Sequence, residues 1–166
     1  MDLYNKLLFN TLRFLKFRDR SEQEIRDYLH QKKAAPEIIE KIISYCIDHK
    51  FINDKKFAAD WVRSRSTYRL KSKKIIKIEL IKKGIAPEII EKALTDMQEN
   101  ETNENIDLTL AKKLVQLRLP RYINLPHQEI YQKLGGFLSR RGFNWETIKQ
   151  AIDSELALEY NKQNKH

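Results

Sequence analysis

The hexapeptide Pro-Glu-Ile-Ile-Glu-Lys occurs twice in the chain, at residues 36–41 and again at residues 87–92. The match extends beyond the hexapeptide: a shift of 51 positions also aligns Ser21 with Ser72. A third, weaker copy lies between residues 134 and 152, at a shift of 58 positions from the second. An internal period near 50 residues indicates tandem copies of one structural unit.

The pattern within each copy predicts three short helices, because apolar residues recur every three or four positions. Ser21 followed by Glu24 is a capping-box pattern that begins the second helix of the first copy. Pro36 suits the first turn of the third helix, and Gly84 suits a left-handed C-cap. No segment alternates with period two. We therefore predict an all-α protein of three tandem three-helix, helix-turn-helix-like repeats, stacked in an elongated, curved array because each unit has little core of its own.

The repeat boundaries follow from these helices and from one polar stretch. Asn53 or Asp54 is expected to cap the first helix of the second repeat. The polar, acidic segment QENETNENID indicates a linker ahead of the third repeat. We place the repeats at residues 1–52, 53–98 and 108–158, with a linker at 99–107 and a frayed tail at 159–166.

The composition excludes several classes of protein. Hydrophobic residues make up 41% and charged residues 33% of the chain, and its apolar runs are too short to cross a membrane. With no secretory signal pattern either, a cytoplasmic protein is expected. The single cysteine, Cys46, excludes an internal disulfide and is expected to be a buried apolar residue. Neither metal-ligand spacing, a glycine-rich phosphate loop nor a pair of catalytic carboxylates is evident, so we predict a non-enzyme without metal or cofactor.

Positive charge is concentrated in the middle of the chain. The net charge is +9, and residues 63–83 hold nine basic residues but only one acidic residue, Glu79. Such a cluster of one sign indicates a polyanion or an acidic protein surface as partner, although a solvated helix face is the simpler alternative. Arg140 and Arg141 either contact the same partner or compensate a helix dipole. The predicted partner-binding or nucleic-acid-binding residues are Arg63, Arg65, Arg69, Lys71, Lys73, Lys74, Lys77, Lys82, Lys83, Arg140 and Arg141.

Four aromatic residues receive specific predictions. Phe57 and Trp61 lie on the apolar side of a predicted helix and are assigned to the core. Trp145 takes the position of Pro36 and is expected to be partly exposed. Tyr68, which stands between arginines, suits stacking on a base, but we expect it to pack on its own repeat.

Three segments together resemble one known family. They are Asn53–Val62 running into Arg63 and Arg65, Glu79–Ile85, and Phe137–Phe143 followed by Ile148. In this order and at this spacing they are similar to the RecX family of regulatory proteins, which have three tandem three-helix repeats and modulate the RecA recombinase. The sequence departs from the family pattern at Lys33-Ala34 and Leu70-Lys71, where glycine is common. These departures bear on turn conformation.

The resemblance implies binding in the helical groove of a RecA–single-stranded-DNA filament, with inhibition of filament growth in recombination and SOS DNA repair. We expect a monomer whose partners are that filament and, through weak salt-dependent contacts, the single-stranded DNA backbone. The alternative is a direct DNA-binding protein of tandem helix-turn-helix-like modules. A preponderance of lysine favours backbone contacts over base reading. A helical scaffold without a nucleic-acid connection would leave the basic cluster unexplained.

Overall fold

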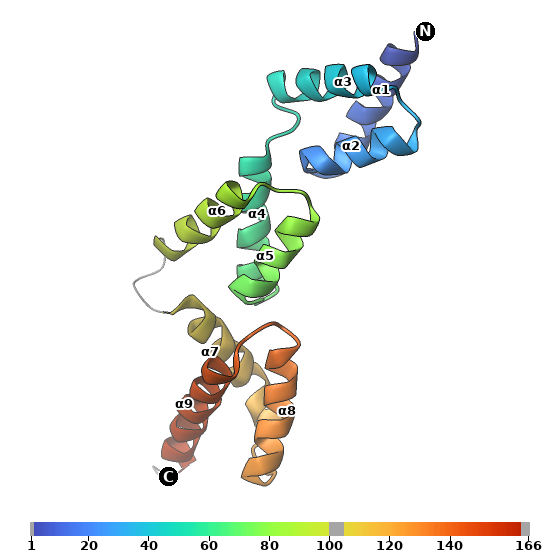
Figure 1. Ribbon diagram of the computed structural model, residues 1–166. Coiled ribbons are helices and arrows are strands. Elements are labelled where there is room, and N and C mark those ends of the chain that lie inside the picture. The colour runs from blue at the N-terminus through green and yellow to red at the C-terminus, as the bar shows by residue number, and fades with distance from the viewer. Residues whose placement is uncertain (1, 100–104, 164–166) are drawn as a thin grey trace. The chain divides into compact units, whose positions relative to one another are not determined.

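The structure, a computed structural model, describes residues 2–99 and 105–163 (Figure 1). Nine α-helices and one short 3-10 helix dominate the described residues, which contain no strand, and this confirms the all-α prediction. The helices are α1 (Leu3–Leu15), α2 (Glu22–Gln31), α3 (Pro36–Asp48), α4 (Asp54–Thr67), α5 (Lys73–Lys82), α6 (Pro87–Glu99), α7 (Ile106–Arg118), η1 (Leu119–Arg121), α8 (His127–Ser139) and α9 (Trp145–Gln163).

Packing divides the chain into two compact units. The first unit comprises Met1–Trp61 and Ile78–Ala93, and the second unit comprises Val62–Lys77 and Leu94–His166. Each unit therefore holds one complete set of three helices and a share of α4, α5 and α6. The middle helices belong to both units.

In the first unit, α1, α2 and α3 lie together (Figure 1). They enclose a core of mainly aliphatic side chains. Ile25, Leu29 and Ile42 are fully buried there, and each such side chain contributes about 1.5–3 kcal/mol by leaving water. Cys46 is also fully buried, as predicted, and burial raises the pKa of its thiol to about 11. It is a core residue without thiolate character at neutral pH.

In the second unit, α7 packs against α8 and α9 (Figure 1). The α8 residues Leu134 and Leu138 and the α9 residues Ala151 and Ile152 are fully buried in this core. Leu70, from the loop after α4, packs against the same cluster. The loop is thereby fixed to the third set of helices.

The predicted caps form, with one reassignment. Ser21 Oγ accepts a hydrogen bond from the Glu24 amide, and the Glu24 carboxylate accepts one from the Ser21 amide, so the capping box is complete. Of the two candidates for capping α4, Asn53 performs the role, because its side chain accepts the Lys56 amide at 3.0 Å. Asp54 instead accepts the amide of Glu22 at 2.9 Å and so caps α2.

The turns after the second helices take the left-handed conformation. Gly84 has φ +72° and Gly142 has φ +88°, which confirms the role predicted for Gly84. Lys33 (φ 57°), in the turn after α2, and Leu70 (φ 47°), in the loop after α4, take the same conformation with a side chain. Both lie in the two segments that depart from the glycine pattern, so the turn is kept there at a cost in strain.

Three helix ends differ from the predicted segmentation. α6 extends to Glu99, α7 begins at Ile106 with Asn105 as N-cap, and α9 continues to Gln163. The end of α9 gains an ion pair between Lys162 and Glu159, one turn apart. Residues 100–104 of the predicted linker and 164–166 of the predicted tail lie outside the described residues.

Candidate nucleic-acid interface

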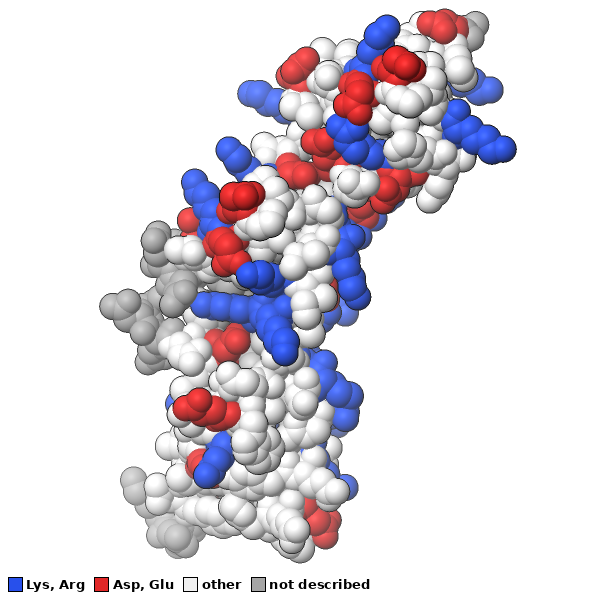
Figure 2. Space-filling model, in the orientation of Figure 1, with Lys and Arg blue, Asp and Glu red and all other residues white. Residues whose placement is uncertain are grey.

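The predicted basic residues are divided between the two units. Lys82 and Lys83 belong to the first unit. Figure 2 colours all Lys and Arg side chains on one face of the protein; they protrude into solvent, and Asp and Glu side chains lie between many of them. The second unit contains the other nine: Arg63, Arg65, Arg69, Lys71, Lys73, Lys74, Lys77, Arg140 and Arg141.

The α5 lysines form the predicted cationic face. Lys74 and Lys77 are exposed and Lys73 is half-buried, whereas Ile76 and Leu80 on the opposite side of the helix are fully buried. The helix therefore presents its charge to solvent because its apolar stripe is fixed in the core.

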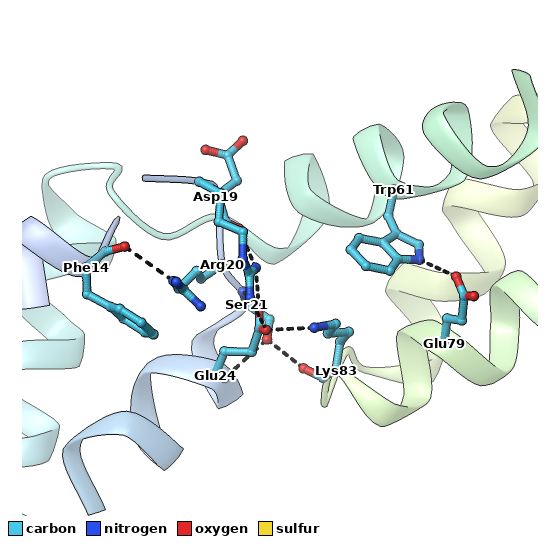
Figure 3. A network of polar contacts seen from close by, with 9 residues as sticks. Phe14, Asp19, Arg20, Ser21, Glu24, Trp61, Glu79 and Lys83 are labelled. Carbon is cyan, nitrogen blue, oxygen red and sulfur yellow. Dashed lines mark hydrogen bonds and ion pairs between the residues drawn. The ribbon is translucent and has the colours of Figure 1, made fainter. Parts of the chain in front are cut away.

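Lys83 is occupied by contacts within the first unit (Figure 3). Its ammonium pairs with Glu24 at 2.7 Å and lies 5.3 Å from the centre of the Trp61 ring. Its side chain is only 26% exposed. Trp61 is itself half-buried and donates its indole N–H to Glu79 at 3.0 Å. Lys83 therefore serves the fold of the first unit as well as carrying charge.

Glu24 is the centre of that network. Burial opposes its ionisation, but hydrogen bonds from Arg18, Lys83 and the Ser21 amide lower the pKa of Glu24 to about 2. Ser21 Oγ also donates to the Lys83 carbonyl at 2.6 Å. Figure 3 shows the contacts of Lys83 with Ser21 and Glu24. We call these contacts, together with the hydrogen bond from the Glu22 amide to Asp54, the first junction.

An equivalent set of contacts occurs inside the second unit. Asp107 accepts the Lys73 amide at 3.0 Å, as Asp54 accepts that of Glu22. The Ser72 amide donates to the Arg141 carbonyl at 3.2 Å. We call these contacts of Arg141 and Asp107 with the N-terminal end of α5 the second junction. The sequence repeat is therefore also a repeat of interfaces.

Beside the second junction, two arginines share one aromatic ring. The Cζ atom of Arg118 lies 3.7 Å and that of Arg141 lies 4.8 Å from the centre of the Phe137 ring. Arg141 also donates to the carbonyl of Arg69. Burial and, to a smaller extent, the charge of Arg118 lower the pKa of Arg141. Two cations are thus held close together, at electrostatic cost.

Tyr68 does not pack on its own repeat, and that prediction is wrong. Its side chain is 81% exposed. The Lys71 amide bonds back to the Arg65 carbonyl. In this loop Leu70, rather than Tyr68, reaches the core. Phe57 is buried, as predicted, but Trp61, which was assigned to the core with it, is only half-buried. Trp145 is 62% exposed, in agreement with its predicted exposure.

Arg118 and Phe137 were not predicted as binding residues. A signal for Arg118 existed, because a shift of 53 positions aligns it with Arg65 of the basic stretch. Phe137 gave none, since an aromatic residue on an amphipathic helix is ordinarily part of a core. Their proximity to Arg141 depends on folding between residues distant in sequence.

No group of three or more His, Cys, Asp or Glu side chains in the described part of the chain is placed to hold a metal ion. A depression of about 420 Å³ lies between the end of α4 and α7, lined by residues that include Thr67, Leu70 and Lys113. No helix among the described residues is long and apolar enough to cross a membrane.

The fold defines a class: an all-α protein of tandem three-helix repeats. The chain belongs to the RecX family of regulatory proteins. Its residues match the family models of all three RecX three-helix domains, the first at 11–46, the second at 53–94 and the third at 105–152.

Individual relatives agree with this assignment. The chain is 33% identical over 143 residues to "Regulatory protein RecX" of Bacillus subtilis, covering 86% of this chain and 52% of the relative. It is 30% identical over 154 residues to the protein of the same name from Streptococcus uberis, covering 92% and 56%. The chain thus spans little more than half the length of these relatives. These relatives carry the name of a regulatory protein.

Solved structures show the same fold. The crystal structure of RecX from Lactobacillus salivarius is similar with a TM-score of 0.77 and 28% identity, covering 93% of this chain and 97% of that one. A second structure, of a regulatory protein RecX, gives a TM-score of 0.74 and 29% identity, covering 90% and 73%.

Proposed function

We propose that this protein is a cytoplasmic, monomeric regulator that binds the RecA–single-stranded-DNA filament and lowers recombinase activity and filament growth in recombination and SOS DNA repair. Membership of the RecX family, whose relatives are named regulatory proteins, supports this proposal. The observation that carries it is the cationic surface of the second unit, which combines the exposed lysines of α5 with Arg140 and Arg141. An anionic nucleoprotein filament is complementary to such a surface.

The direct test measures the activity of RecA in the presence of this protein. DNA-dependent ATP hydrolysis and strand exchange by RecA are followed while this protein is added in substoichiometric amounts at low salt. Inhibition that weakens steeply as salt rises is expected, because added salt reduces the free energy gained from counterion release and screens the attraction between the cationic surface and the filament. Full recombinase activity at low salt contradicts the proposal.

Charge reversal locates the interface. Replacing Lys73, Lys74 and Lys77 with Glu is expected to abolish inhibition while the helical circular dichroism stays unchanged, because the apolar side of α5 is untouched. A matched control reverses three exposed lysines of the first unit: Lys6, Lys16 and Lys41. If both triple variants lose inhibition equally, net charge alone, and not the position of the α5 lysines, accounts for the inhibition. Loss of helicity in the first variant indicates that the α5 lysines are structural.

Sequence-selective duplex binding in the absence of RecA would support the alternative, a DNA-binding protein of tandem helix-turn-helix-like modules. Competition between unrelated duplexes measures it. Equal affinity for all of them is expected if cations contact only the backbone.

A further inference from the structure

The two junctions use equivalent residues but differ in one charge. The shifts that align the repeats place Ile75 where the first junction has Glu24, and Arg141 where it has Lys83. In the first junction, the Glu24 carboxylate binds Lys83 and Arg18. The second junction keeps a cation and has a half-buried isoleucine in place of the carboxylate. It therefore contains the cationic half of an ion pair whose anionic half is missing.

Ile75, which stands in place of the carboxylate, lies close to the backbone next to Arg141. A Cβ atom on Gly142, the next residue, would collide with Ile75 Cγ1. Arg141 instead lies beside Phe137, together with Arg118. Among the residues that the structure describes, no carboxylate forms an ion pair with either guanidinium. Two guanidinium groups beside one ring repel each other, and an anion bound from solution would offset that repulsion.

We propose that Arg118 and Arg141 together bind one phosphate group of a single-stranded nucleic acid, which supplies the anion that Glu24 supplies in the first junction. A guanidinium presents five N–H donors in a planar fork that matches phosphate oxygens. Arg141 spends one donor on the Arg69 carbonyl, and its remaining donors stay available. Contact with the Phe137 ring holds both guanidinium groups in place before the ligand arrives, which reduces the entropy lost on binding.

Tyr68 favours nucleic acid over an acidic protein surface as the source of the anion. The residue is 81% exposed, and it precedes Arg69, whose carbonyl accepts the hydrogen bond from Arg141. An exposed aromatic ring next to a phosphate-binding group is the arrangement that stacks an unpaired base. The inference deepens the proposed function, on which it rests for the choice of single-stranded DNA as the ligand.

The test uses the full chain without RecA. Binding to fluorescein-labelled oligo(dT) is measured by fluorescence anisotropy over a series of salt concentrations. Arg118→Gln is expected to weaken binding about tenfold and to reduce the slope of log K against log salt by about 0.7, the value for one phosphate contact on a single strand. Arg121→Gln, an equal charge loss at an exposed position three residues away, is the matched control and is expected to weaken binding about twofold or less. Equal effects in the two variants overturn the proposal.

Ile75→Glu tests the missing charge itself. It rebuilds the carboxylate of the first junction, so it is expected to neutralise Arg141 from within and to weaken oligo(dT) binding as strongly as Arg118→Gln. Its melting temperature is expected to equal or exceed that of Ile75→Gln, which has the same shape without the charge and keeps its affinity. A folded Ile75→Glu protein with wild-type affinity overturns the proposal. If that variant does not fold, the comparison of Arg118→Gln with Arg121→Gln decides.

Failure of this inference is distinguishable from failure of the proposed function. If wild-type protein leaves RecA fully active but binds oligo(dT) through Arg118, the phosphate site stands and the regulatory proposal falls. If Arg118→Gln binds oligo(dT) normally but inhibits RecA poorly, the arginine pair meets carboxylates of the recombinase, and the phosphate assignment is overturned.

Discussion

Replacing Glu24 with Gln tests whether one ionised carboxylate holds the first junction. The pKa of Glu24 is lowered from 4.5 to about 2 in the folded protein. One pKa unit corresponds to about 1.4 kcal/mol, so the ionised carboxylate contributes about 3 kcal/mol at neutral pH. Only 17% of its side chain is exposed, so screening by solvent removes little of this contribution. Glu24→Gln is therefore expected to lower the free energy of unfolding by about 2–3 kcal/mol.

The pH dependence supplies a second, independent prediction. Because the folded pKa lies below the unfolded one, the stabilisation is present above about pH 4.5 and is lost as the pH falls toward 2. The difference in unfolding free energy between wild type and Glu24→Gln is expected to shrink to nothing over that range.

Urea unfolding followed by tryptophan fluorescence measures both effects. A Trp145→Phe background leaves Trp61, which lies in the first unit near Lys83, as the only reporter. The control is Glu40→Gln: Glu40 also pairs with an arginine, Arg26, but its side chain is 64% exposed, so a much smaller effect is expected. The reasoning is refuted if wild type and Glu24→Gln have the same free energy of unfolding at pH 7. It is also refuted if their difference in unfolding free energy is as large at pH 2–3 as at pH 7.

Three further substitutions test the turns and caps. Gly84→Ala forces a Cβ atom into the left-handed region and against Gln23 Cβ, so a loss of at least about 1–2 kcal/mol in urea unfolding is expected. Lys33→Gly relieves the same conformation and is expected to raise the melting temperature, with a gain of about 0.5–1 kcal/mol; a lower melting temperature contradicts the assigned strain. Asp54→Ala removes the acceptor for the Glu22 amide and is expected to cost about 1 kcal/mol, while Asp54→Asn keeps an acceptor oxygen and costs less, as thermal melts will show.

The sequence predicted what local chemistry decides. The Ser21–Glu24 capping box, the left-handed Gly84 and the buried Cys46 all follow from residues within one or two turns of each other. The repeat supplied the order of the helices, because each copy has the same apolar spacing. Helix ends at Glu99 and Gln163 were less predictable, since polar residues extend a helix without leaving an apolar pattern.

Contacts between distant residues were not predictable in this way. Lys83 pairs with Glu24, which lies 59 residues away in the sequence. Lys83 was predicted to be a surface cation, but this contact makes it part of a half-buried network. Arg141 reaches the Arg69 carbonyl 72 residues away, and nothing in either local sequence indicates it. Tyr68 was assigned to packing because aromatic residues usually bury area; the direction of the loop, set by the Lys71 amide, decides otherwise.

The division of α4 and α5 between the units has a consequence for truncated versions of this protein. A fragment ending at residue 52 would contain a whole repeat and its Ser21–Glu24 capping box, yet it would lack Asp54 and Lys83, leaving the Glu22 amide without its acceptor and Glu24 without one of its cations. The smallest autonomous piece is thus larger than the sequence period. Insertion or loss of one repeat during evolution would have to preserve the junction contacts on both sides of it. This requirement favours exchanged segments whose ends lie within a helix and not between repeats.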